Sequence, residues 1–326
     1  MKFVRRSWPY MALLLIVAAG VGFWFTHDAL LDWVFLRGYQ PAATIKQFAS
    51  EDTMTPYAQR LFYVNRPALE DKDAFNAHCK DPSDQVVVLG CYTGDRHGIY
   101  LYNVTEPLLN GVQQVTAAHE MLHQAYDRLD TAERKRIDAL LGQYADAAAP
   151  QQIKEQLSSY QQSEPRQLAN EMHSIFGTEV ADLPAELELY YKQYFANRAV
   201  VVGFYQKYQG EFDRRKAQIA DYDEQLATLK SRIEADKANL KTSEKTLLAR
   251  KADMDALLAA DRIVQYNAAV PAFNAQVNAY RDEFNRVNAV VGEYNSLLDR
   301  RNAIAVQERN LERAVDSAGA TPAAKQ

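Results

Sequence analysis

The pattern of apolar and polar residues divides the chain into three unlike regions, and the first is an uncharged apolar run. It extends from Trp8 to Thr26 and follows a start that is rich in Lys and Arg. A helix of about 19 residues is ~28 Å long, which matches the apolar core of a bilayer. Residues 1–27 are therefore predicted to be a cytoplasmic N-terminus and a transmembrane anchor, with the rest of the chain outside. A cleaved signal peptide is the alternative.

The second region, residues 28–202, alternates short strands and helices. Gln85–Tyr92 and Ile99–Val104 are rich in β-branched and aromatic residues and enclose a Gly-containing turn, which predicts a β-hairpin. Met54–Val64 has helical spacing and a Pro near its start. Other helices are expected at 119–128, from 131, at 164–177 and from 182 onwards, the last as one long helix with an aromatic face.

The third region, residues 203–316, carries two heptad seams. Apolar residues recur in steps of three and four from Ile219 to Leu257 and again from Val270 to Leu298. The phase breaks between the two seams, which predicts an antiparallel helical hairpin, with a continuous rod that forms a parallel dimer as the alternative. Such a coiled coil would bind a protein partner or a second copy of the chain. Residues 317–326 are expected to be a disordered tail.

Together these regions predict an α+β fold that is mainly α. It would comprise an N-terminal transmembrane helix, a compact domain with a small sheet, and a C-terminal coiled-coil hairpin. The formal net charge of −5 comes with no strongly basic region, so nucleic acid is not expected as a partner. The N-terminal helix would make the membrane itself a partner.

The only two cysteines, Cys79 and Cys91, flank a turn segment that contains Pro82. Their spacing does not fit a compact zinc knuckle. A disulfide that closes this short loop is expected in an oxidising compartment, and two unpaired thiols are the alternative.

The segment around His119, Glu120 and His123 is the clearest candidate for chemistry. It contains His-Glu-x-x-His within a run of good helix formers that lacks Pro and Gly. Two imidazoles four residues apart lie on one face of a helix, one turn apart. Both can then reach one Zn²⁺ at ~2 Å, with Glu120 beside the water of the metal. An exposed helix with two incidental histidines is the alternative interpretation.

A catalytic zinc needs a third protein ligand and an open position for water. Downstream lies Asn170-Glu171-Met-His-Ser174, followed by Phe-Gly-Thr. The pair of motifs resembles the gluzincin metallopeptidases, and closely the thermolysin-like pattern. The resemblance covers about a tenth of the chain. It departs from the pattern where the Asp expected after Ser174 is replaced by Ile175.

The resemblance implies a zincin-like metallopeptidase domain over 28–202 that binds Zn²⁺. It implies His119, His123 and Glu171 as metal ligands and Glu120 as the general base. It also implies Asn170 as a group that orients one histidine. Asp127 falls where thermolysin-like enzymes carry an Asp.

Several alternatives remain open at this stage. His173, Glu179 and Glu186 compete with Glu171 as the third ligand. A metzincin is excluded, because no further His with an intervening Gly follows His123 closely. The candidates for stabilising an oxyanion are Tyr190, Tyr191, Tyr194 and Arg198. The strand Ile99–Val104 is expected to offer an edge to an extended substrate.

The expected function is therefore hydrolysis of peptide or protein substrates by a membrane-anchored, extracytoplasmic zinc metallopeptidase. Its nucleophile would be a zinc-bound water activated by Glu120. The alternative is a membrane-anchored coiled-coil scaffold without enzymatic activity, in which the zinc site is structural or vestigial. Glu120 between the two histidines favours the enzyme, since a structural site needs no base.

Overall fold

The computed structural model describes residues 27–79 and 88–317. This part of the chain is mostly helical and contains one small sheet. It divides into two compact units, one made of residues up to 210 together with 313 onwards, the other of residues 211–312. The predicted boundary at 203 thus lies within the first unit. The inclusion of the C-terminal residues in that unit was not predicted.

The membrane prediction is the first to be corrected. Among the described residues, no helix is long and apolar enough to cross a membrane. Of the two longest helices, α10 (Arg198–Ala259) carries charged side chains along its length. The first part of α11 (Ile263–Val315), up to Tyr280, is uncharged but is interrupted repeatedly by Asn and Gln. The run from Trp8 to Thr26, on which the anchor was predicted, lies outside the described residues. The predicted transmembrane helix and the single-pass, extracytoplasmic location are corrected on this finding alone: the described part of the chain contains no helix that could span a membrane.

The sheet has three strands in the order β1-β3-β2. β2 (Gly90–Tyr92) and β3 (Ile99–Tyr102) are antiparallel, which confirms the predicted hairpin, while β1 (Ala68–Glu70) pairs with β3 in parallel. β1 was not predicted because three residues give no detectable alternation. The central strand is thus β3, whose two edges are both occupied. The expectation that Ile99–Val104 offers a free edge is wrong, and the edge strands are β1 and β2.

Side-chain caps account for where several helices of the first unit begin. Thr55 caps α3 (Pro56–Val64), Asp71 caps α4 (Lys72–His78) and Asp130 caps α6 (Thr131–Ala147), each by accepting backbone N–H groups. The remaining short elements are α2 (Ala43–Glu51), the 3₁₀ turn η1 (Pro107–Leu109), α5 (Val112–Asp127), α7 (Gln151–Ser163), α8 (Leu168–Thr178) and α9 (Ala185–Tyr191).

Two helix predictions need correction. α7 was not predicted, although Ile153, Leu157 and Tyr160 recur at helical spacing in it. The single long helix expected from 182 is divided into α9 and α10 by a turn. Tyr194 and Phe195 in that turn are buried, and the backbone there bonds to residues 53–55. Tertiary contacts thus stop α9 where the aromatic pattern alone would extend it.

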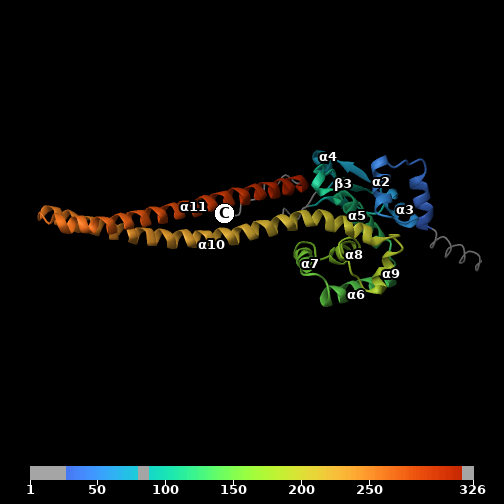
Figure 1. Cartoon of the computed structure of the whole chain (residues 1–326). Helices are drawn as coiled ribbons and strands as arrows, with labels where there is room; N and C mark the ends of the chain where they lie inside the picture. Colours follow the sequence, from blue (N-terminus) through green and yellow to red (C-terminus); the bar gives the residue numbers. More distant parts are fainter. Residues whose placement is uncertain (1–26, 80–87, 318–326) are drawn as a thin grey trace, which may run out of the picture. The chain divides into compact units, whose positions relative to one another are not determined.

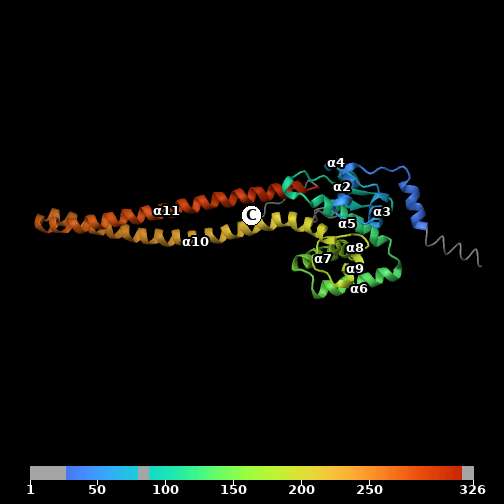
Figure 2. The same cartoon turned by 45° about the vertical axis from the view of Figure 1, so that its right-hand side comes forward.

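α5 occupies the centre of the first unit. It contacts α2, α3, β2 and β3 on one side and α8 on the other, and α8 in turn contacts α6 and α7. Figures 1 and 2 show these two groups of elements on either side of α5. The core includes Met121, Leu122 and Phe176, each fully buried. The motif helix is therefore held by apolar packing on both sides, which fixes the direction of its polar face.

The disulfide between Cys79 and Cys91 is confirmed. It joins the end of α4 to β2, with Cα atoms 5.8 Å apart. β2 consequently has a covalent attachment in addition to its hydrogen bonds to β3. This restricts the position of the edge strand that lies along α5.

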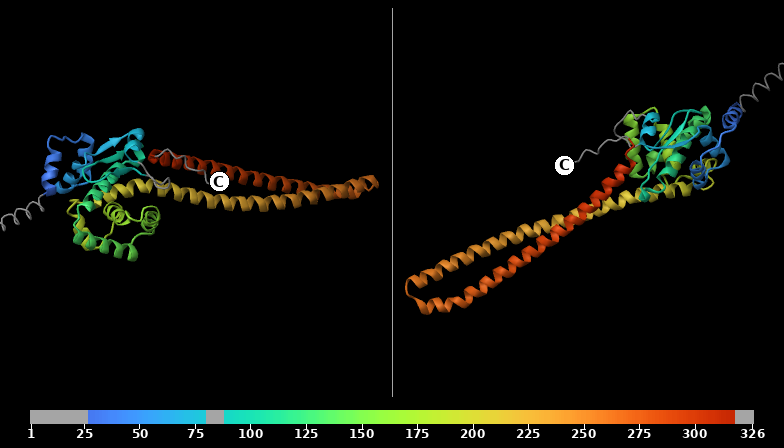
Figure 3. Two further views of the ribbon diagram at one scale, coloured as in Figure 1. Left: turned by 180° about the vertical axis from the view of Figure 1, so that it is seen from behind. Right: turned by 90° about the horizontal axis from the view of Figure 1, so that it is seen from above.

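The second unit is an antiparallel helical hairpin. The Arg301 guanidinium binds the Asp223 carboxylate, and the Ser243 hydroxyl donates to Glu283, so residue numbers rise along one arm as they fall along the other. The arms meet at a turn in which Asp261 has φ +57°. Figure 3 shows the arms side by side and joined at one end. The turn excludes a single continuous rod.

The last described residues return to the first unit. The Lys72 ammonium donates to the backbone oxygen of Asp316, and the Asn76 amide donates to that of Ser317. The Ser317 hydroxyl donates to the Val88 carbonyl at 2.6 Å. The residues directly after α11 are thus attached both to α4 and to Val88, two residues before β2.

Asp52 should lower stability at neutral pH. Its side chain is fully buried and its carboxylate oxygens have no hydrogen-bond partner among the described residues. Burial, followed by the nearby Glu51 charge, raises the pKa of Asp52 well above its ordinary value. The unfolded chain therefore releases this proton at lower pH than the folded chain. The resulting loss in the free energy of unfolding is absent below the unfolded pKa of about 3.9. It grows above that pH and is complete above the pKa of Asp52 in the folded chain.

We expect Asp52→Asn to raise the free energy of unfolding at pH 8 by about 1–3 kcal/mol. Urea unfolding from pH 4 to pH 8 measures this, and the difference from wild type should shrink towards pH 4. Asp182→Asn, at an exposed position, is the matched control and should change little. A constant difference at every pH would contradict the assignment.

Candidate metal centre

α5 presents its polar residues to a cleft. His119 and His123 lie one turn apart with ring centroids separated by 4.8 Å. One ligand atom from each of His119, Glu120 and His123 lies within 4.8 Å of the others. This group could hold a metal ion. The imidazole side chains are only 16% and 10% exposed, so a ligand there would be largely shielded from solvent.

α8 brings Glu171 to the two histidines. Its Oε2 lies 3.5 Å from His119 Nε2, and its Oε1 lies 3.6 Å from His123 Nε2. Both separations exceed ordinary hydrogen-bond lengths. Oε2 is buried without a hydrogen-bond partner among the described residues. A cation placed among these three side chains would satisfy that oxygen, so the donor set fits a metal ion.

Neighbouring groups orient His123. Its Nδ1 lies 3.0 Å from Asn170 Oδ1 and 3.2 Å from the Ser174 hydroxyl. The Asn-Glu-x-x-Ser motif of α8 therefore contributes both the candidate ligand Glu171 and two polar contacts to a histidine of α5. Asp127 accepts a hydrogen bond from the Tyr92 hydroxyl at 3.0 Å.

The close approach of α8 to α5 depends on Gly177. A Cβ at this position would lie 2.3 Å from Leu122 Cδ1 and 2.8 Å from Tyr191 Cε1, both on fully buried side chains. Glycine therefore lets the two helices pack at the distance that brings Glu171 to the histidines. This gives a structural reason for the Gly in Phe-Gly-Thr.

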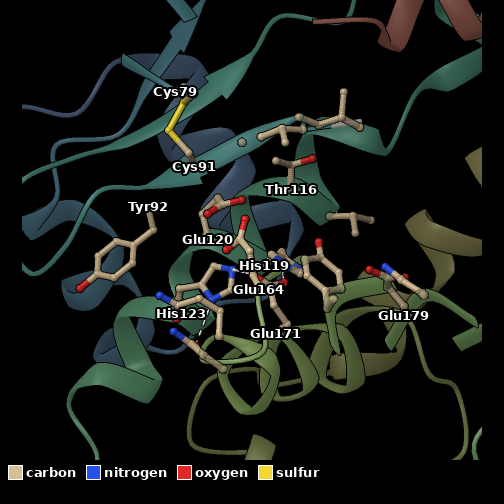
Figure 4. A pocket seen from close by; sticks show the side chains of 18 of the residues that line it. Cys79, Cys91, Tyr92, Thr116, His119, Glu120, His123, Glu164, Glu171 and Glu179 are labelled. Atoms are coloured by element: carbon tan, nitrogen blue, oxygen red, sulfur yellow. Dashed lines mark hydrogen bonds and ion pairs between the residues drawn. A yellow bond between two sulfur atoms is a disulfide. The ribbon is translucent and has the colours of Figure 1, made fainter. Parts of the chain in front are cut away.

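Glu120 lies on the other side of the histidines, beneath β2. Burial raises its pKa to about 7, with the His123 charge opposing that rise and Glu171 adding to it. A backbone hydrogen bond from Tyr92 of β2 favours the ionised form. A Cβ on Gly90 would lie 2.8 Å from Glu120 Oε1, so glycine is needed where β2 crosses α5. Figure 4 shows Glu120, the two histidines and Glu171 facing one cleft.

The pKa of Glu171 shifts in the opposite direction to that of Glu120. Burial raises its pKa, but the His123 charge, His119 and the Tyr160 hydroxyl outweigh burial, so the net shift is downward. Glu171 is thus held ionised, as a metal ligand must be. Glu120 and Glu171 share one cleft yet differ in proton affinity, because burial dominates at Glu120, whereas the two imidazoles and the Tyr160 hydroxyl outweigh burial at Glu171.

The other three candidates for the third metal ligand lie in different places. His173 is fully buried among tyrosine rings, and its Nε2 bonds to the Tyr190 hydroxyl at 2.8 Å. Burial lowers its pKa to about 3, so it is neutral. Glu186 pairs with Arg136 at 2.9 Å, away from the histidines. Glu179 does line the cleft, beyond Glu171.

The predicted oxyanion candidates do not line the cleft. Tyr190, Tyr191 and Tyr194 form a buried cluster around His173. Arg198 is buried and binds Glu188 and the carbonyls of Phe176, Val180 and Ala181. These residues therefore stabilise the fold behind α8. Their aromatic pattern reflected core packing.

The cleft has a volume of about 920 Å³. The sequence did not indicate several of its lining residues, which come from separate elements: Gly90 and Tyr92 from β2, Tyr160 from α7, and Tyr205 and Tyr208 from α10. Only the helical spacing of α7 offered a signal for one of them, Tyr160. The others could be found only from the fold.

Comparison with models of protein families, with curated proteins and with solved structures found no match to this chain. The function is therefore inferred from the arrangement of the side chains in the cleft.

Metal binding should depend on residues from both α5 and α8. We expect wild-type protein to bind one equivalent of a divalent transition metal, and His119→Ala, His123→Ala and Glu171→Ala each to weaken binding by at least about tenfold. Titration calorimetry with metal analysis after dialysis measures both quantities. Glu186→Ala, at the rival position outside the cleft, should bind as wild type does. Unchanged binding in Glu171→Ala would contradict the three-residue site.

Gly177→Ala should separate α8 from α5. The added methyl group overpacks a buried contact, and we expect a loss of about 1–3 kcal/mol in the free energy of unfolding together with weaker metal binding. Denaturant unfolding and the same metal titration test this. Gly142→Ala in α6 is the control. Its Cβ would meet nothing within 4 Å, so it should stabilise the helix by roughly 0.5–1 kcal/mol. Equal effects of the two substitutions would contradict the packing argument.

Proposed function

We propose that this protein is a zinc-dependent peptidase with His119, His123 and Glu171 as metal ligands and Glu120 as general base. The observation that carries the proposal is the convergence of these ligand atoms beside a second, buried carboxyl group. A structural metal site has no use for that second group. A peptidase needs it to activate water.

The donor set favours zinc over harder cations. Two imidazoles and one carboxylate are typical ligands of catalytic zinc, whereas magnesium and calcium prefer oxygen ligands alone. Ligands held ~2 Å from one zinc ion at tetrahedral angles lie ~3.3 Å from one another. The separations of 3.5 Å and 3.6 Å between Glu171 and the imidazole nitrogens are close to this value.

Zinc bound there would lower the pKa of its water and polarise a substrate carbonyl. Glu120 would accept a proton from that water and pass it to the departing amine. Its buried position, with a pKa raised to about 7, suits a group that gains and loses a proton near neutral pH. Asn170 and Ser174 hold the His123 ring in place during the reaction.

Tyr160 is the candidate for stabilising the oxyanion. Its hydroxyl donates a hydrogen bond to Glu171, which lowers the pKa of that carboxyl group, so it lies beside a proposed metal ligand. Burial, followed by the charges of Glu171 and Glu179, raises the pKa of Tyr160, so the hydroxyl stays protonated and can donate. It replaces Tyr190, Tyr191, Tyr194 and Arg198 in this role, because it lines the cleft and they do not.

β2 is the proposed contact for the substrate backbone. It is one of the two edge strands of the sheet, and Gly90, Cys91 and Tyr92 all line the cleft, whereas no residue of β1 does. An extended peptide can add to such an edge through main-chain hydrogen bonds, which position one of its carbonyl groups near Glu120. The disulfide at Cys91 would hold this edge in place.

Glu120→Gln should separate metal binding from catalysis. Glutamine has nearly the same shape but cannot accept the proton, so we expect kcat to fall by about 10²–10⁴-fold while metal content stays unchanged. Cleavage of a mixed peptide library, followed by mass spectrometry, measures the activity. Glu186→Gln is the control outside the cleft. Full activity in Glu120→Gln would eliminate its role as base, and no cleavage by zinc-loaded wild type would favour a non-enzymatic scaffold.

A further inference from the structure

The cleft extends beyond the metal centre to side chains that the proposed hydrolysis does not use. Glu179 follows directly after α8, Gln156 comes from α7, and Tyr205 and Tyr208 come from the first turns of α10. Figure 4 shows Glu179 in the same cleft but set apart from His119 and Glu171. This end of the cleft can therefore contact a part of a substrate that is remote from the bond to be cleaved.

Glu179 carries an ionisable carboxyl group, and its hydrogen-bond partners are neutral side chains. Its carboxylate accepts hydrogen bonds from the Gln156 amide and the Tyr205 hydroxyl. Among the described residues that line the cleft, none is Lys or Arg, whereas Glu164, Glu171 and Glu120 add further negative charge. Burial raises the pKa of Glu179 to about 7, which reflects the cost of its charge without a cation nearby.

The side chains around Glu179 suit a cation. The Tyr205 and Tyr208 rings lie with their centroids 5.6 Å apart and nearly perpendicular to each other. Both rings line the cleft. An aromatic face attracts an ammonium or guanidinium group, and a carboxylate beside it supplies the charge-assisted hydrogen bond. The excess of carboxylates in a half-enclosed cleft would also concentrate cationic ligands.

We propose that Glu179, with Tyr205 and Tyr208, binds an ammonium or guanidinium group of the substrate and makes the enzyme selective for peptides with a positive charge. This inference rests on the proposed peptidase function. Two parts of a peptide carry this chemistry, a Lys or Arg side chain and a free N-terminus. Glu179 is a specificity-determining residue in this proposal, and the metal ligands and Glu120 retain their roles.

The test compares matched peptides on the zinc-loaded full chain. One series places Lys, Arg, norleucine or citrulline at each position in turn, and each peptide is made with a free and an acetylated N-terminus. We expect wild type to prefer the cationic member of one pair, and Glu179→Gln to lower kcat/KM for that member by roughly tenfold to hundredfold. The neutral member should be cleaved equally by both. If the preference lies between Lys and norleucine or between Arg and citrulline, the bound group is a side chain. If it lies between the free and the acetylated peptide, the bound group is the N-terminus.

Two controls keep the test specific. Glu155→Gln makes the same chemical change at an exposed position on α7 and should leave the preference intact. Thermal unfolding of Glu179→Gln checks the fold, since glutamine can still accept the hydrogen bonds from Gln156 and Tyr205. Wild-type cleavage with no preference for charge, or a preference that survives in Glu179→Gln, would overturn the inference and leave the proposed function standing.

A binding measurement separates the inference from the proposed function. The same peptides are titrated into Glu120→Gln, with and without the additional Glu179→Gln substitution, under conditions where no cleavage occurs. Tighter binding of the cationic peptides that is lost with Glu179→Gln supports the site even if wild type cleaves nothing. Equal binding of cationic and neutral peptides would overturn it.

Discussion

The packing of α5 against α8 is the contact on which the rest of the site depends. The two histidines lie on α5 and the candidate carboxylate ligand lies on α8, so the distance between these helices determines whether three ligands can meet. Gly177 permits that distance because no side chain separates Leu122 from the backbone of α8. The buried aromatic cluster around His173 supports α8 from behind. Apolar packing therefore sets the geometry of a polar site.

Electrostatics then give two nearby carboxyl groups different properties. Glu171 lies against both imidazoles and is held ionised, while Glu120 is buried beneath β2 and has its pKa raised to about 7. The difference arises from position, since both residues are glutamates in the same cleft. One is thereby suited to bind a cation and the other to exchange a proton.

The first unit also includes the first turns of α10 and the residues from 313 onwards. The first turns of α10 contribute Tyr205 and Tyr208 to the cleft, and the residues after α11 bond to α4 and to Val88 beside the edge strand. Each attachment lies within the first unit. The start of α10 thus lines the cleft. The heptad seams account only for the parts of α10 and α11 that lie in the second unit.

The amino-acid sequence by itself determined the elements with strong periodicity or compact motifs. The heptad seams, the hairpin of β2 and β3, the helix of His119 and His123, and the Cys79–Cys91 pair all follow from local spacing, because side chains a few residues apart are positioned by the backbone alone. Local spacing was less informative elsewhere: the apolar run from Trp8 to Thr26 predicted a membrane anchor, whereas no described helix could cross a membrane. The tyrosines after 190, which were candidates for stabilising an oxyanion, belong to the core.

Only the tertiary structure decided which distant residues share the cleft. It brought Glu171 to the histidines and removed His173 from them, although the two residues are neighbours on one helix. It made β3 the central strand and β2 an edge strand, and it placed Tyr160, Glu179 and the tyrosines of α10 in the cleft. These outcomes depend on which faces of separate helices pack together. That choice is made by the burial of the whole core, which no single motif encodes.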